Sequence, residues 1–461
     1  MKKKIYFLCL GIALFVGLNG NCQQQLAFSF GETPQTLMLN PGAETNFKYH
    51  FGIPVLSNFN LNAGITGFNL SELFLADNGN FDNKFERVLN KLTEEDYINI
   101  NARIDILNGG YRYDEKTYLS FGFYEEVDII AYIPKDFADL WYYGNVGELN
   151  RAFSFSQLTF KADILGVLHA GISRKVNKQL NIGARVKIYS SSFNIESNHN
   201  SGTFTTFENS QNILRQSLND VNVEVRTSGL IGNNDKALEN ATDLISNTFL
   251  GGNLGIGFDF GFTYHFTPQL ELTGSILDLG FVRHSKSTRV YSAEGDYTFD
   301  GINFTGFDPT NPTDYWQQLE DDFDDRVPTD ETAEAYTSWR PTKINAALKY
   351  SFGDIRLKKC FTDTYKRYYY NSIGFQVHSI LRPKGPQLSF TSFLETSITE
   401  KIHSKVTHTI NDFSALIIGS GFTFQWGNVN VFGLVDNMLG ARDLISASNV
   451  TVNFGINIAI E

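Results

Sequence analysis

A strict alternation of residue types runs through long stretches of this sequence and constrains its fold more than any other feature. Between Leu254 and Phe266 every even position is apolar or aromatic, whereas the odd positions hold glycine, aspartate, threonine and histidine. A period of two places the two sets on opposite faces of one β-strand. The same alternation recurs at residues 98–106, 180–188, 344–352 and 450–460. The sequence therefore predicts an all-β fold.

The alternating runs are long enough to cross a membrane. A tilted strand needs about 9–11 residues to span the hydrocarbon layer, whereas strands of soluble proteins more often have about 5–6. Inside a bilayer only helices and closed barrels satisfy every backbone polar group, and no apolar run after the N-terminus is long enough for a membrane helix. We therefore predict a transmembrane antiparallel β-barrel over residues 46–461. A large secreted β-sandwich is the alternative.

Short and long connections alternate along most of the chain. Short turns are expected at 113–117, 174–179, 267–269 and 427–428, and long segments near 68–96, 134–161, 191–250 and 285–340. Short periplasmic turns opposite long outer loops are typical of such barrels. Between Asp354 and Asp412 this pattern cannot be followed, so about 14 strands are expected, with 12 to 16 left open.

Two of the long segments are expected to contain short helices. Apolar residues lie at helical spacing in 81–92, and residues 134–143 begin with proline and are rich in aromatic residues. Aromatic side chains are enriched at membrane–water interfaces. The two helices are therefore expected either at the membrane interface or over the mouth of the barrel.

The first 22 residues have the three parts of a secretory signal peptide. Lys2 to Lys4 precede an apolar stretch from Ile5 to Val16, and small residues stand before a plausible cleavage site at Gln23. The apolar stretch is too short for a membrane helix. We therefore predict that residues 1–22 are a cleaved signal peptide. A lipoprotein attached through Cys22 is the alternative.

The composition limits the partners and the means of stabilisation. The chain is acidic, with a formal net charge of −12, which argues against a nucleic-acid partner. After cleavage only Cys360 would remain, so an internal disulfide is excluded although the chain enters an oxidising compartment. Closure of a barrel within a bilayer is one way to stabilise such a chain.

The sequence contains no pattern typical of an active site. Gly255, Gly257 and Gly261 lie within a predicted strand and not at its turn into a helix, so they do not form a dinucleotide-binding motif. A calcium site is the alternative to simple solvation for one acidic cluster, which consists of Glu320, Asp321, Asp322, Asp324 and Asp325. That cluster lacks EF-hand spacing, so we predict no metal site. Because the sequence contains no pattern typical of an active site, we also predict no enzyme activity and no cofactor.

Polar positions of the alternating runs are predicted to face the lumen of the barrel. The candidates are Arg103, Arg185, Lys187, Asp259, Thr263 and His265. Asp259 and His265 share one face but lie about 20 Å apart along the strand, at about 3.3 Å per residue, so they form no direct pair. The lumen is expected to be solvated there, and Asp259→Asn is expected to be tolerated.

Several motifs resemble those of known outer-membrane barrels. Asn40-Pro41-Gly42 resembles the beginning of fatty-acid-transporter-like barrels, and the hairpin 171–187 resembles a strand pair of Bacteroidota barrels. Residues 277–281 and 435–437 resemble landmarks of one uncharacterised Bacteroidota family that is similar to the shuttle barrel of the type nine secretion system. The resemblance implies a barrel of about 14 strands, with residues 23–45 as an N-terminal hatch in its lumen.

Two functions are compatible with an integral barrel of the outer membrane in a Gram-negative bacterium. In the first, the protein is a porin-like barrel that passively takes up or binds a small hydrophobic molecule. In the second, it is a non-enzymatic structural or docking subunit of a secretion or cell-surface complex. In both, membrane lipid, lipopolysaccharide and the barrel-assembly machinery are expected partners. An open lumen would favour uptake, and a lumen filled by the N-terminal segment would favour docking.

Overall fold

The computed structural model describes residues 26–30, 33–75, 80–197, 199–208, 214–229, 247–300, 312–355 and 368–460. The predicted signal peptide, residues 1–22, lies outside the described residues, as do residues 23–25 and Cys360. None of the described helices is long and apolar enough to cross a membrane.

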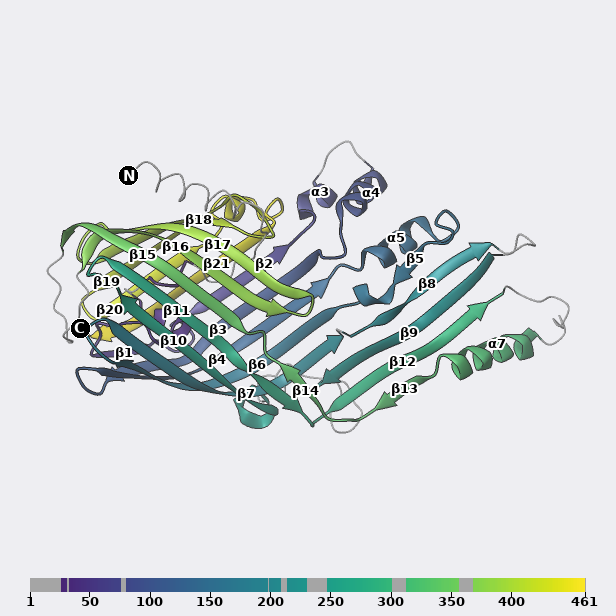
Figure 1. Ribbon diagram of the computed structural model, residues 1–461, viewed down its shortest axis with the longest axis horizontal. Coiled ribbons are helices and arrows are strands. Elements are labelled where there is room, and N and C mark those ends of the chain that lie inside the picture. Colours follow the sequence, from purple (N-terminus) through teal and green to yellow (C-terminus); the bar gives the residue numbers. More distant parts are fainter. Residues whose placement is uncertain are drawn as a thin grey trace.

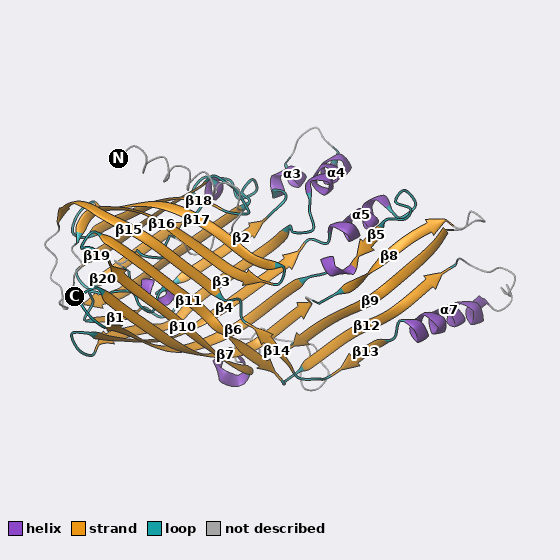
Figure 2. Ribbon diagram, viewed as in Figure 1, coloured by secondary structure: helices purple, strands orange, loops and turns teal. Residues whose placement is uncertain are grey.

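Fourteen antiparallel strands close into a barrel (Figure 1, Figure 2). In ring order they are β1 (Tyr49–Gly52) with β2 (Phe59–Ile65), β3 (Tyr97–Arg112), β4 (Thr117–Tyr132), β6 (Phe160–Lys175), β7 (Leu180–Ser197), β10 (Asn253–His265), β11 (Leu270–His284), β14 (Tyr336–Trp339) with β15 (Lys343–Ile355), β16 (Tyr369–Arg382), β17 (Gly385–Ser397), β18 (Ile402–Ile410), β19 (Ile417–Trp426), β20 (Val429–Val435) and β21 (Asn449–Ile460). β1 and β2 count as one strand because both pair with β3 and β21, and β14 and β15 because both pair with β11. The pairing of β21 with β1 and β2 closes the ring, which confirms the predicted barrel of about 14 strands.

The connections explain why the strand count was ambiguous in the sequence. The C-terminus lies at the short-turn end of the barrel, on the left in Figure 1. At that end, β15 and β16 are joined through residues 356–367, which lie outside the described residues. At the opposite end, where long connections prevail, Arg382 of β16 pairs directly with Gly385 of β17 in a tight hairpin. In this region the long connection lies at the short-turn end and the short hairpin at the opposite end. The usual arrangement is therefore reversed where the sequence pattern could not be followed.

Three segments predicted as long loops build a second sheet outside the barrel. It consists of β5 (Ala152–Ser154), β8 (Ser201–Glu208), β9 (Leu214–Ser228), β12 (Thr288–Phe299) and β13 (Thr329–Thr332), paired in the order β5-β8-β9-β12-β13. We call it the outer sheet. It continues from the barrel because the end of β9 pairs with the end of β7. Figure 1 shows it projecting well beyond the ring, together with α7 (Pro312–Arg326).

Short helices accompany the remaining connections. They are α3 (Leu70–Phe74), α4 (Phe81–Lys91), α5 (Lys135–Tyr143), η1 (Phe155–Gln157), η2 (Asn247–Gly251) and η3 (Gly440–Arg442). α4 and α5 confirm the two helices predicted at 81–92 and 134–143. Val88 and Leu89 of α4 are buried against neighbours that include Ile133 and Ala138, at the outer end of β4 and on α5.

The wall has an apolar exterior. Phe258, Phe260 and Phe262 of β10 are 42%, 48% and 37% exposed, whereas Asp259 between them is 0% exposed. The predicted alternation of faces is therefore confirmed in this strand. Similarly exposed side chains on other strands form what we call the apolar belt, which includes Ile98, Ile100, Ile172, Ile182, Phe258, Phe260, Phe375 and Phe454.

Two exposed tryptophans mark opposite ends of the wall. Trp339 lies on β14 at the outer end, and Trp426 ends β19 at the short-turn end. An apolar surface of this extent is not stable in water, and aromatic girdles on either side of an apolar band are typical of membrane barrels. The exterior therefore has the construction of a barrel that spans a bilayer.

A charge on the apolar belt should disturb folding strongly. We expect Phe260→Arg to destabilise the folded barrel by about 2–4 kcal/mol if Phe260 lies near the middle of the membrane. The measurement is the yield of heat-modifiable barrel on gels after refolding into lipid vesicles. Phe260→Leu is the matched control, because it keeps an apolar side chain. Equal yields from the two variants would show that Phe260 does not face lipid.

Candidate functional site

The described part of the N-terminal segment, which begins at Leu26, lies inside the ring of strands (Figure 1). Its first described residues, Leu26, Phe28 and Phe30, are each at most 2% exposed. Leu26 and Phe30 pack against β20, whereas Phe28 packs against β15 and β17. A short helix, α2 (Thr36–Leu39), follows them. We call residues 26–47 the plug.

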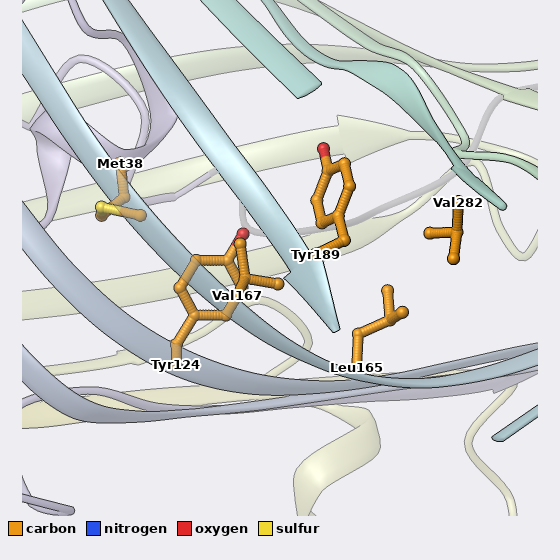
Figure 3. Packing of buried hydrophobic residues seen from close by; sticks show 6 residues of the cluster. All are labelled: Met38, Tyr124, Leu165, Val167, Tyr189 and Val282. Carbon is orange, nitrogen blue, oxygen red and sulfur yellow. The ribbon is translucent and has the colours of Figure 1, made fainter. Parts of the chain in front are cut away.

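The middle of the plug packs on the opposite arc of the wall. Met38 of α2 is buried in an apolar cluster that Figure 3 shows. The wall residues of this cluster are Tyr124, Leu165, Val167, Tyr189 and Val282. Since these residues come from β4, β6, β7 and β11, the plug is in contact with strands all around the ring.

Asn40-Pro41-Gly42 lies flat against the wall because glycines face it. A Cβ on Gly261 would lie 2.1 Å from the Asn40 side-chain oxygen, and a Cβ on Gly183 would lie 2.0 Å from the Pro41 carbonyl oxygen. A Cβ on Gly42 itself would lie 2.4 Å from the carbonyl oxygen of Gly261. Backbones approach this closely only where side chains are absent. Gly183 and Gly261 of the alternating runs therefore allow close contact with the plug.

Side chains of the wall donate hydrogen bonds to carbonyl oxygens of the plug. The donors and acceptors are Lys405 to Phe28 (2.7 Å), Lys349 to Ser29 (3.2 Å), Arg185 to Leu37 and to Met38 (3.2 Å to the latter), Ser275 to Leu39 (2.6 Å), Asn181 and Thr263 to Gly42 (2.9 Å each), and Arg112 to Thr45. The plug has little regular structure to satisfy these groups, and an unpaired buried carbonyl is costly. The wall therefore holds the plug by its backbone.

Three of the six predicted lumen residues, Arg185, Lys187 and Asp259, are in direct contact. Asp259 accepts hydrogen bonds from Arg185 (3.0 Å) and from the backbone N–H of Asp278 (2.8 Å), and it forms an ion pair with Lys187 (2.9 Å). Lys187 also pairs with Asp278 at 2.6 Å. Asp278 has φ +58° in a bulge of β11, and the Asp259 carboxylate satisfies its amide. Thr263, two residues along β10 from Gly261, is hydrogen-bonded to the plug.

The other two predicted lumen residues lie elsewhere. His265 contacts Glu44 of the plug at 3.0 Å. Arg103 pairs with Asp105 at 2.8 Å and lies over the Tyr124 ring, 3.7 Å from its centre. Both side chains are buried, as are the four described above. The expectation of a solvated lumen is therefore wrong at these positions, because the plug and the ion pairs exclude water.

A second group of ion pairs crosses the lumen from β4 and β6 to strands on the far side of the ring. Arg340 pairs with Glu126 and Asp163 at 3.2 Å each, and Arg382 makes a two-pronged contact with Asp128 at 2.7 and 3.0 Å. These charges are buried. The alternation places Glu126 and Asp128 on one face of β4, but no sequence pattern indicates their partners, so sequence analysis missed this group.

Lys343 connects the two groups of ion pairs. Its ammonium group lies 3.4 Å from Glu126 and 3.1 Å from Asp278. Between these groups and the plug remains a cavity of about 40 Å³, bordered by Met38 and Tyr124 among others. A site for one water needs at least about 10–15 Å³ by a comparable measure, so this cavity is too small for an organic solute.

A larger apolar groove lies on the outside of the wall, directly behind Asn40-Pro41-Gly42. Its volume is about 730 Å³, and it is lined by belt residues of β6, β7, β10, β11 and β15, including Ile172, Ile182, Phe260, Phe262, Ile276 and Ile344. Small residues at its base, Ala184, Gly274 and Ala346, leave the space open. The groove faces the lipid side, and the plug lies on the other side of the same wall.

The described residues contain no constellation for catalysis or metal binding that we could identify. Among them, no three His, Cys, Asp or Glu side chains converge as metal ligands. The acidic cluster considered for calcium lies exposed on α7, where its carboxylates point into solvent. The buried charges of the lumen are paired with one another, so the arrangement holds a structure together.

Comparison with protein families gives one match. The model of a family of unknown function, DUF5723, matches residues 41–436. A comparison with curated proteins gives no significant match.

Solved structures with a similar chain path are barrels of low identity. The Ralstonia pickettii toluene transporter TbuX is 11% identical, with a TM-score of 0.44 over 96% of this chain and 97% of that chain. A Pseudomonas aeruginosa FadL homologue is 9% identical, with a TM-score of 0.40 over 95% and 99%. The Pseudomonas putida toluene transporter TodX is 10% identical, with a TM-score of 0.38 over 96% and 98%. Since these TM-scores are below 0.5, the fold rests on the strand pairings described above.

Proposed function

The chain belongs to the DUF5723 family of unknown function, and we propose that its plugged barrel is a non-enzymatic docking subunit for a secretion or cell-surface complex in the outer membrane. The observation that supports this role is the filled lumen. The plug contacts the wall on all sides, and buried ion pairs cross the remaining space. A conducting pathway would require these charges to separate in a dry environment, which is costly.

The outer sheet is the surface that we propose for docking. Most residues of β8, β9 and β12 keep part of their side chains accessible. The sheet is anchored rigidly, because β9 pairs with β7. Tyr297 of β12 packs edge-on against Phe323 of α7, with ring centres 5.1 Å apart. A broad surface held clear of the membrane suits a protein partner.

The proposed location rests on the wall of the barrel. Its apolar belt requires lipid, and an even number of strands brings both ends of the barrel domain to the same side. In the outer membrane of a Gram-negative cell, that side is the periplasm and the outer sheet faces outward, toward lipopolysaccharide. The barrel-assembly machinery is the expected route of insertion.

The apolar groove supports a second candidate, the uptake or binding of a small hydrophobic molecule. Such a molecule would enter the groove from the lipid side, since β7 and β10 pair without a break between the groove and the plug. Ala184→Phe should fill the groove and abolish binding of a fluorescent aromatic hydrocarbon by the barrel in lipid nanodiscs. Val186→Phe is the matched control on the same outer face of β7. Equal binding by both variants and the natural chain would remove this candidate.

Docking is tested by isolation from native outer membranes in a mild detergent. We expect the intact protein to carry a partner in fixed stoichiometry and to give no current in planar bilayers. Deletion of α7, residues 312–326, should release the partner without loss of the heat-modifiable barrel, because α7 lies outside the ring. Large, stable currents from the intact protein, or isolation without any partner, would contradict the docking role.

A further inference from the structure

Exposed apolar side chains gather on the helices at the outer rim of the barrel. Phe74 of α3 is 67% exposed and Trp141 of α5 is 79% exposed. Leu70, Leu75 and Phe81 are also among the exposed apolar residues. We call these five residues the rim patch. Isolated exposed apolar residues need no explanation, but a contiguous group marks an interaction site.

The rim patch is held in place from beneath. Phe85 is at its centre, because its ring packs 6.1 Å from the ring of Phe81 and 5.8 Å from that of Trp141. On its other side Phe85 packs against the buried cluster around Val88 and Leu89. The exposed rings are therefore fixed outward and do not fold back onto the protein.

Hydrogen bonds between α3 and α4 hold the two helices together. Lys84 of α4 donates a hydrogen bond to the carbonyl oxygen of Leu75, and Lys91 pairs with Glu72 of α3. With α3 and α4 linked in this way, the rim patch keeps its shape as one surface.

The rim patch continues the apolar belt. α3 follows the outer end of β2, and α4 precedes β3, whose first outward residues, Ile98 and Ile100, belong to the belt. The backbone N–H of Ser71 donates to the carbonyl oxygen of Ile445 at 2.8 Å, and Ile445 is itself exposed. In Figure 1, α3 and α4 lie beside the rim and not over the mouth of the barrel.

We infer that the rim patch binds the outer leaflet of the membrane, with Phe74, Phe81 and Trp141 in its interfacial region. Tryptophan and other aromatic residues are enriched at that depth, and a surface continuous with a lipid-facing wall meets lipid first. The contact would fix the height and tilt of the barrel and thus the direction in which the outer sheet projects. This inference rests on the proposed membrane location.

Fluorescent labels at three positions test the inference. In a Cys360→Ser background, single cysteines at Phe74→Cys, Phe375→Cys and Val146→Cys carry the polarity-sensitive label NBD. Phe375 is a belt residue. Val146 is 65% exposed beyond α5, next to Asn145, which is hydrogen-bonded to Thr206 of the outer sheet. Val146 is therefore a matched apolar position above the membrane. Emission is measured in nanodiscs with ordinary lipids and with lipids brominated near the headgroup.

The expected result is a blue-shifted emission at position 74 that brominated lipid quenches, and no quenching at position 146. If position 74 behaves like 146 while position 375 is quenched, the barrel is in lipid and the inference is wrong. If none of the three is quenched, the proposed membrane location fails first. Shielding of position 74 in native membranes but not in pure lipid would assign the rim patch to a protein partner and overturn the inference.

Discussion

Deletion of residues 26–42 should convert a barrel that carries no current into one that conducts ions. The deletion removes every plug residue whose carbonyl oxygen accepts from Lys349, Lys405 or Arg185. Water and ions then enter the lumen and weaken the attraction within the ion pairs that cross it. The fourteen strands remain, because their backbone hydrogen bonds run between neighbours in the wall. The measurement is the appearance of stepwise currents in planar bilayers.

The matched control for this deletion leaves the plug in place. Thr33 is buried within the plug and its hydroxyl donates only to the plug's own Phe30 carbonyl oxygen among the contacts described. Thr33→Ala should therefore remain silent in the same bilayers. A deletion variant that is inserted and heat-modifiable but silent would show that the ion pairs alone close the lumen. The role of the plug would then be structural.

Replacement of one carboxylate should cost about 3–5 kcal/mol of stability, which is typical when one partner of a buried ion pair is removed. Asp259 is fully buried. It accepts hydrogen bonds from Arg185 and from the backbone amide of Asp278, and it forms an ion pair with Lys187. Asp259→Asn therefore removes the carboxylate that pairs with Arg185 and leaves Asp278 to both Lys187 and Lys343. The measurement is the urea dependence of unfolding in lipid vesicles. This result would reverse the tolerance that the sequence suggests, since that expectation assumed a solvated lumen.

A second substitution separates charge imbalance from lost packing. In the double variant Asp259→Asn with Lys187→Met, one cation is removed together with one anion, while Asp278 keeps its contact with Lys343. Most of the lost stability should return if the unpaired charge is the cause. No recovery would mean that the lost ion pair with Arg185, which the double variant does not restore, carries the effect.

The two faces of a strand such as β10 can be predicted from periodicity alone. A side chain's face depends only on the parity of its position, so the apolar exterior of β10 and the inward direction of Asp259 and Thr263 follow locally. The same local pattern predicted α4, because its apolar residues recur at helical spacing. The plug, in contrast, was expected only because Asn40-Pro41-Gly42 resembles the beginning of fatty-acid-transporter-like barrels.

The contacts of each inward side chain depend on closure of the ring and cannot be predicted from local sequence. Glu126 on β4 pairs with Arg340, which lies far along the chain, because closure of fourteen strands brings the two sides of the ring within reach. Whether a lumen residue is solvated or dry likewise depends on the plug, which lies next to Gly261 only after the ring has formed. The position of the outer sheet likewise depends on the pairing of the end of β9 with the end of β7. Period two specifies a face but carries no information on the strand across the lumen. The wall could therefore be predicted, and the ion pairs that cross the lumen could not.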